Sequence, residues 1–190
     1  EAPVVNALVE GGIRAFQIAV SIPQCFKVIE NLAKRDSLVV GAGSVHDGEI
    51  AQRAINAGAR FIVTPFTDKD VIYVCMNSDT MVVQAAATPT EAMSAVKLGV
   101  DLVEIYPVDL LGGPAYIKAL RGPLPSLKLA ASGGITVENA FEYVKLGVTA
   151  VVLGSGVIEK SLIRANNWSE IRERARQLTE KIDSLKTVKS

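Results

Sequence analysis

The chain has 190 residues, its 20 Lys plus Arg are balanced by 20 Asp plus Glu, and 49% of its residues are hydrophobic. This composition is typical of one soluble globular domain and excludes a disordered or fibrous protein. The basic residues are spread along the chain, which argues against nucleic-acid binding. No apolar run approaches the roughly 20 residues that a membrane-spanning helix needs. We therefore expect neither a nucleic-acid partner nor a membrane span.

The cysteine and histidine content argues against a metal site. Cys25, Cys75 and the single histidine, His46, are too few for a Cys/His zinc site, and two cysteines do not form a disulfide framework. We expect no metal, no cofactor and a reducing compartment, either the cytoplasm or the plastid stroma. The first residues show no charged segment followed by an apolar core, so no signal peptide is visible.

Short runs rich in Val, Ile and Leu alternate with Ala-rich amphipathic segments, which predicts repeated βα units and a buried parallel sheet. Residues 3–10 have the pattern of the end of a helix. Strands are expected at 13–20, 37–42, 60–64, 81–86, 100–106, 127–131 and 149–153. Helices are expected at 23–34, 47–57, 68–76, 89–98, 113–120, 136–146 and 168–184, with a short helical turn near 157–163.

Glycines and one capping sequence mark the helix ends. Gly12, Gly58, Gly99 and Gly147 each follow a predicted helix just before a strand. Glycine suits this position because it adopts the left-handed backbone conformation without a Cβ clash. Thr88-Pro89-Thr90-Glu91 combines an N-cap hydroxyl, Pro at the first helical position and Glu at the third, which predicts a capping box.

Seven strands separated by helices, with no long linker, predict a (β/α)₈ TIM barrel that is one strand short. We expect the first strand upstream of Glu1, so that residues 1–190 form a single barrel domain that is incomplete at its N-terminus. The competing fold is an open doubly wound sheet. Its G-x-G-x-x-G turn is absent, and Gly41-Ala42-Gly43 leads into Ser44-Val45-His46 instead.

Ligands of a parallel barrel meet the carboxyl ends of its strands. The strongest signal there is Ser132-Gly133-Gly134 after one strand and Gly154-Ser155 after the next. Backbone N–H groups bared by glycine bind phosphate well, so these residues predict a phosphate site, with Thr64 and Thr88 as further ligand-binding candidates. The alternative is that the glycines serve only tight turns.

A set of short motifs along the chain resembles the 2-keto-3-deoxy-6-phosphogluconate (KDPG) and 4-hydroxy-2-oxoglutarate (KHG) aldolases. The motifs are Gly11-Gly12-Ile13, Val40-Gly41-Ala42-Gly43-Ser44-Val45, Phe61-Ile62-Val63-Thr64-Pro65, Thr88-Pro89-Thr90-Glu91, Tyr106-Pro107, Gly112-Gly113, Gly122-Pro123 and Ser132-Gly133-Gly134-Ile135 with Asn139. The resemblance implies a (β/α)₈ barrel and a homotrimer. It also implies a class I mechanism, in which a lysine on barrel strand six forms a Schiff base with pyruvate.

The catalytic positions of this family are altered. Where the family has Lys-Phe-Phe-Pro or similar, this chain has Glu104-Ile105-Tyr106-Pro107, and a carboxylate cannot form an imine. The family's proton-shuttling Glu falls at Gln17, and its substrate-binding Arg falls at Ser21. Two further departures are Gln84-Ala85 in place of Pro-Gly, and Pro65-Phe66 in place of Pro-Gly or Pro-His.

No other lysine is expected to replace the missing one. Lys128 is the only lysine on a predicted strand, and it lies about 13 Å before the strand's carboxyl end, at about 3.3 Å per residue. Lys69 could reach the rim of the barrel but would remain hydrated, whereas an imine-forming amine must be desolvated.

These departures favour an aldolase homologue that has lost Schiff-base activity, retains a phosphate pocket and acts as a binding component or as a subunit of a larger assembly. On this interpretation Glu104 is a hydrogen-bonded carboxylate, with Gln17 or Tyr106 as its partner. The alternative is a lyase or isomerase that acts on a small phosphorylated 2-keto acid with Glu104 as general base. That alternative lacks an evident acid partner, because Asp109 lies beyond the strand and Gln17 is neutral.

Overall fold

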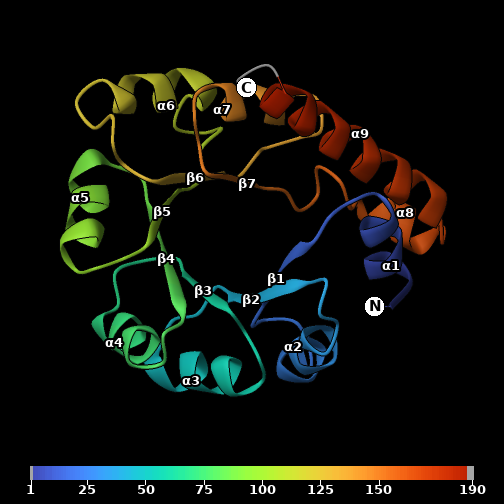
Figure 1. The fold of residues 1–190 in the computed structure, drawn as a ribbon, viewed down its shortest axis with the longest axis horizontal. Coiled ribbons are helices and arrows are strands. Elements are labelled where there is room, and N and C mark those ends of the chain that lie inside the picture. The colour runs from blue at the N-terminus through green and yellow to red at the C-terminus, as the bar shows by residue number, and fades with distance from the viewer. Residues whose placement is uncertain (1, 188–190) are drawn as a thin grey trace. The chain divides into compact units, whose positions relative to one another are not determined.

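The computed structural model describes residues 2–187, which fall into two compact units. One unit runs from Arg14 to Ile105, and the other combines the residues up to Ile13 with those from Tyr106 onward. Strands and helices alternate along the chain in both (Figure 1). None of the described helices is both long and apolar enough to cross a membrane.

The Arg14–Ile105 unit contains five parallel strands, each paired with the next in chain order. The strands are β1 (Ala15–Ala19), β2 (Val39–Gly43), β3 (Phe61–Thr64), β4 (Met81–Ala86) and β5 (Leu102–Ile105). Between them run α2 (Cys25–Ala33), α3 (Gly48–Asn56), α4 (Lys69–Asn77) and α5 (Pro89–Lys97). Figure 1 shows these four helices along the outer side of the strands.

The strand register of this unit divides its side chains between two faces. Gln17 pairs with Gly41, Gly41 with Phe61, and Ala85 with Glu104. Because side chains alternate along a strand, Gln17, Gly43, Val63, Val83, Ala85, Leu102 and Glu104 share one face, here called the Glu104 face. The opposite face includes Ile18, Ala42, Ile62, Val82 and Val103, all of them buried.

The second unit contains two parallel strands and five helices. Strands β6 (Leu129–Ser132) and β7 (Ala150–Val152) pair with Ser132 opposite Val152. The helices are α1 (Ala2–Glu10), α6 (Gly113–Arg121), α7 (Ala140–Lys145), α8 (Lys160–Arg164) and α9 (Trp168–Thr187). Helix α1 packs against α9, where Thr179 Oγ1 donates to the Gly11 carbonyl at 2.8 Å.

The seven predicted strands and the predicted helices are confirmed within residues 2–187, with shifted ends. Gly12, Gly58, Gly99 and Gly147 all have φ between 80° and 99°, as expected at helix ends. The eighth strand, expected upstream of Glu1, lies outside the described residues.

Several elements begin later than predicted, and the largest differences are at the starts of two helices. The helix predicted from 136 begins at Ala140, because Thr136 and Asn139 first form a turn in which each backbone amide donates to the other's side chain. The helical turn predicted from 157 begins at Lys160, because the amide of Ile158 donates back to the Gly154 carbonyl. The strand predicted from 127 begins at Leu129.

Candidate functional site

Glu104 is the buried acid of the Arg14–Ile105 unit. It lies on β5 with 5% of its surface exposed, and Ala85 is its register partner on β4. Its neighbours on the Glu104 face include the apolar residues Val83 and Leu102, both buried. Burying a carboxylate at this depth destabilises the fold unless polar groups pair with it. Glu104 therefore differs from the exposed acids of this unit.

Gln17 lies on the same face, at the other end of this row of strands. A Cβ on Gly43 would collide with the Gln17 side chain, so glycine at 43 makes room for this amide to lie across β2. The amide can donate and accept hydrogen bonds but cannot exchange a proton at ordinary pH. The position at which the resemblance places a proton shuttle therefore holds a neutral group.

Thr64 lies on the opposite face, where it is fully buried. Its hydroxyl donates to the Phe66 carbonyl at 2.8 Å, and the Gln84 amide nitrogen donates to Thr67 Oγ1 at the same distance. These bonds hold the loop after β3 and leave the Phe66 ring 50% exposed. The Thr64 hydroxyl, a ligand-binding candidate in the sequence, is thus used by the chain itself.

Thr88 has a comparable structural role. Its hydroxyl accepts from the Glu91 amide at 3.2 Å, and Glu91 Oε2 accepts from the amides of Ala87 and Thr88. These hydrogen bonds lower the pKa of Glu91. The predicted capping box is therefore confirmed, and a ligand contact of Thr88 stays a prediction.

In the second unit, Gly133 and Gly134 form the loop after β6. Their φ angles are 88° and 79°, a region that favours glycine. The preceding segment runs beside them, since Val108 donates to the Ser132 carbonyl at 2.8 Å and Asp109 to the Gly133 carbonyl at 3.1 Å. Within residues 2–187 the amides of Gly133 and Gly134 donate to no protein acceptor. Two backbone donors are thereby available at the predicted phosphate loop.

Gly154 and Ser155 form the loop after β7, and both are exposed. Nothing lies within 4 Å of the position that a Cβ on Gly154 would occupy, so this part of the loop faces open space. A Cβ on Gly156 would collide with the Ile135 carbonyl, which shows that the loops after β6 and β7 touch. The two glycine loops predicted from the sequence therefore lie together.

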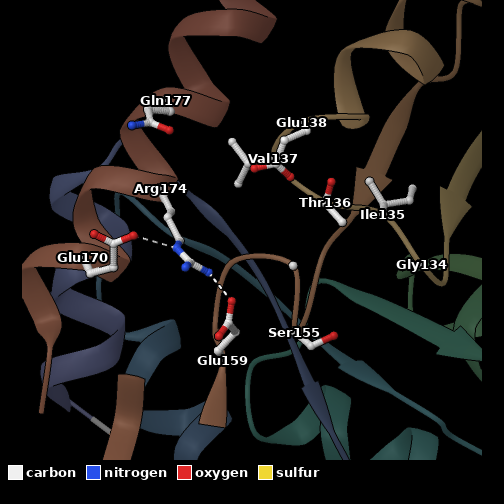
Figure 2. A pocket seen from close by; sticks show the side chains of 11 residues that line it. Gly134, Ile135, Thr136, Val137, Glu138, Ser155, Glu159, Glu170, Arg174 and Gln177 are labelled. Carbon is white, nitrogen blue, oxygen red and sulfur yellow. Dashed lines mark hydrogen bonds and ion pairs between the residues drawn. The ribbon is translucent and has the colours of Figure 1, made fainter. Parts of the chain in front are cut away.

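These loops and helix α9 line an open cavity of about 410 Å³ (Figure 2). Its lining residues are Gly134, Ile135, Thr136, Val137, Glu138, Ser155, Gly156, Glu159, Glu170, Arg174 and Gln177. Arg174 donates to Glu159 at 2.6 Å and to Glu170 at 2.9 Å. The hydrogen bond from Arg174 is the main cause of the lowered pKa of Glu159.

The part played by α9 in this cavity was missed at the level of sequence. The charged residues of α9 do form ion pairs, as their spacing indicates. Arg174 also lines the cavity, and nothing in the local sequence indicates this, because its position depends on how α9 packs. Three glutamates against one arginine make the wall acidic, so an anion here would depend on the backbone amides.

No lysine lies on any of the seven strands of the described chain. Lys128 is exposed and precedes β6, and Lys69 is the exposed first residue of α4. Neither is a desolvated amine of the kind that forms an imine. Among residues 2–187, no group of three or more His, Cys, Asp or Glu side chains could hold a metal ion.

Comparison with known proteins gives the same family along nearly the whole chain. A family model described as KDPG and KHG aldolase matches residues 1–174. The 2-dehydro-3-deoxy-phosphogluconate aldolase of Haemophilus influenzae is 30% identical over 185 residues, which cover 97% of this chain and 86% of that protein. A probable 2-dehydro-3-deoxy-6-phosphogalactonate aldolase of Rhizobium meliloti is 31% identical over 90% of this chain and 80% of that protein.

Comparison with solved structures gives the same family. A structure described as native KDPGal superposes with a TM-score of 0.86 at 28% identity, covering 96% of this chain and 88% of the other. The KDPG aldolase of Legionella pneumophila, with pyruvate captured as a covalent carbinolamine, superposes with a TM-score of 0.85 at 28% identity. The match covers 93% of this chain and 86% of the other. With its parallel strands alternating with helices, the chain belongs to the KDPG and KHG aldolase family.

Proposed function

We propose that this chain binds a phosphorylated small molecule at the carboxyl ends of its strands and does not form a Schiff base with a carbonyl substrate. The observation that carries the proposal is Glu104, buried on β5 where the family resemblance places the reacting lysine. The protein would then be a binding component, or a subunit of a larger assembly, rather than an aldolase.

The reaction chemistry supports this proposal at two positions. A Schiff base forms when an unprotonated amine attacks a carbonyl carbon, and the carboxylate of Glu104 has no nitrogen to form that bond. Proton transfer during such a reaction needs an acid or base, and the amide of Gln17 is neither. The solved relative from Legionella pneumophila holds pyruvate covalently, which this chain would not do.

Retention of phosphate binding is supported by the two glycine loops. Gly133 and Gly134 offer amides without a protein acceptor, and Ser155 is exposed beside open space at Gly154. Backbone N–H groups bind phosphate without a cationic side chain, so the ion pairs of Arg174 do not prevent binding.

Reductive trapping tests the loss of imine chemistry. Incubation of the protein with pyruvate and borohydride should give no covalent adduct by mass spectrometry. Glu104→Lys places an amine in a buried, largely apolar position, where desolvation lowers the pKa of a lysine, and should restore trapping. Glu49→Lys, a change at an exposed residue of α3, is the matched control and should not. An adduct on the unmodified chain would refute the proposal.

Calorimetry with KDPG tests the phosphate site. We expect binding by the unmodified chain and its loss in Ser155→Asp, because a carboxylate beside the glycine loops repels phosphate. Ser37→Asp, at an exposed loop residue of the other unit, should bind normally. Equal affinity of the two variants would place the ligand elsewhere.

A second candidate is a lyase or isomerase that acts on a phosphorylated 2-keto acid, with Glu104 as general base. It is favoured by the position of this carboxylate, where the reacting amine would otherwise stand. Exchange of the protons next to the carbonyl in heavy water, followed by NMR, tests it. Exchange by the unmodified chain and none by Glu104→Gln would favour this candidate over the binding protein.

We also propose that residues 1–190 form one aldolase-type domain and that three copies form a homotrimer in a reducing cytoplasm or plastid stroma. The free, buried thiols of Cys25 and Cys75 suit such a compartment. Light scattering should give a mass three times the 20.2 kDa of the chain. A single cooperative unfolding transition would support one domain.

A further inference from the structure

We infer that Arg174 is a phosphate-binding residue of the second unit and that the Glu159 carboxylate occupies it until phosphate takes its place. This inference rests on the proposed phosphate binding at the glycine loops, and it adds a binding residue and an internal competitor to that site. The residues that carry it all lie in the second unit.

Arg174 lies on the wall of the cavity beside the glycine loops. Gly134 and Ser155, where phosphate binding is proposed, line the same cavity. Figure 2 shows the Arg174 side chain reaching from α9 toward Glu159, the residue just before α8. A phosphate group in this cavity therefore has one cationic side chain within the same wall.

Two carboxylates hold different nitrogens of the Arg174 guanidinium. Glu170, one helical turn earlier on α9, accepts from Nε at 2.9 Å, and Glu159 accepts from Nη1 at 2.6 Å. Nη2 donates to no acceptor among residues 2–187. Once Glu159 leaves, Nη1 and Nη2 together offer the two parallel donors with which arginine binds phosphate. Glu170 still orients the guanidinium through Nε.

Glu159 is a carboxylate that can leave this pairing at little cost. Its side chain is 49% exposed, and that of Arg174 is 27% exposed. An ion pair so open to water contributes little to stability, because both charges stay partly hydrated. The other Glu159 oxygen accepts from the Ser161 hydroxyl at 3.2 Å, which is long for a hydrogen bond between oxygens. Glu159 is therefore weakly held.

The exchange describes how an anion binds beside an acidic wall. While both carboxylates stay paired, the charge of Arg174 is compensated, and the backbone amides of the loops are the main donors to phosphate. Turning Glu159 toward solvent moves one negative charge away from the cavity and frees one edge of the guanidinium. A dianionic phosphate then binds that edge through two charge-assisted hydrogen bonds. The pairing with Glu159 thus keeps the free protein in a state of lower phosphate affinity.

Titration of the full chain with inorganic phosphate, followed by phosphorus NMR, tests this inference. Glu159→Gln keeps the side-chain shape and removes the competing charge, so it should raise the affinity about two- to fivefold, the weight of an exposed ion pair. Arg174→Gln should lower the affinity at least about tenfold, because a charge-assisted bidentate contact is lost. Arg174→Lys keeps the charge without the planar fork and should give an intermediate affinity.

A double variant distinguishes competition for Arg174 from simple repulsion of phosphate by Glu159. With Arg174→Gln present, Glu159→Gln should no longer raise the affinity. An increase that persists in the double variant would overturn the inference. Arg176 is the matched control, because it also bridges two carboxylates of α9, Glu173 and Glu180, but does not line the cavity. Arg176→Gln should leave the phosphate affinity unchanged, and a loss equal to that of Arg174→Gln would contradict the assigned role.

The remaining outcomes separate this inference from the proposed function. If neither the unmodified chain nor Glu159→Gln binds phosphate, phosphate binding is overturned and this inference with it. If the unmodified chain binds phosphate and Arg174→Gln binds it equally well, the inference alone is overturned. Thermal unfolding checks that each variant folds. Should Arg174→Gln fail to fold, Glu159→Gln decides alone, since an unchanged or lower affinity of that variant would overturn the inference.

Discussion

The two glycine loops of the second unit differ in how well they accommodate a substitution of glycine by alanine. At Gly134, φ is 79°, and a Cβ would collide with the Asp109 side chain, reaching 2.8 Å from its Cγ. At Gly154, nothing lies within 4 Å of the corresponding position. We therefore expect Gly134→Ala to destabilise the protein and Gly154→Ala to be tolerated.

Two effects set how much Gly134→Ala should lower the free energy of unfolding. Alanine in the left-handed region costs about 1–2 kcal/mol, and overpacking costs about 1–3 kcal/mol more. The free energy of unfolding should fall by roughly 2–5 kcal/mol, less whatever a shift of Asp109 relieves. Gly154→Ala should change it by less than about 1 kcal/mol.

Urea unfolding followed by circular dichroism measures both variants under one condition. A lower midpoint for Gly134→Ala with an unchanged denaturant slope would mean a loss of native stability. Equal midpoints for the two variants would refute the reasoning, because it would show that the Asp109 contact and the backbone conformation do not constrain residue 134. The double variant Gly134→Ala with Asp109→Ala should recover only the part lost to the clash.

Three further changes are predicted. Thr88→Ala removes the N-cap hydroxyl of α5 and should lower the free energy of unfolding by about 1 kcal/mol, visible as a lower melting temperature. Burial, helped by the charge of Asp101, raises the pKa of Cys75 to about 11. The Cys75 thiol should react with a thiol reagent at pH 8 only after unfolding. The folding stability that comes from the raised pKa of Cys75 should be lost as the pH rises from 9 toward 11. The pKa of Glu173 is lowered to about 2, chiefly by hydrogen bonds from Arg176. The stability that Glu173 contributes to the folded state is therefore present above pH 4.5 and is lost as the pH falls toward 2. An NMR titration should show this low value, and Arg176→Gln should return it toward 4.5.

Local sequence determined the elements of this protein. The alternation of apolar runs with amphipathic segments predicted all seven strands, because a buried parallel strand needs side chains that are apolar on both faces. Helix ends were equally local, since a left-handed residue such as Gly58 and the capping box of Thr88 depend only on their own turn. The expectation that Glu104 stands where the family has a lysine is likewise local, because it rests on the motif Glu104-Ile105-Tyr106-Pro107.

Contacts between distant segments were decided only by tertiary structure. Gly134 must be glycine partly because Asp109 packs on it from 25 residues upstream, and the Gly11 carbonyl accepts from Thr179 across the pairing of α1 with α9. Arg174 reaches Glu159 only because α9 packs against the loop after β7. Periodicity and capping act within a few residues, so they define each element but not which distant side chains it meets. The strands and helices were therefore set by local chemistry, and the cavity wall, its charge and its tolerance to substitution by packing.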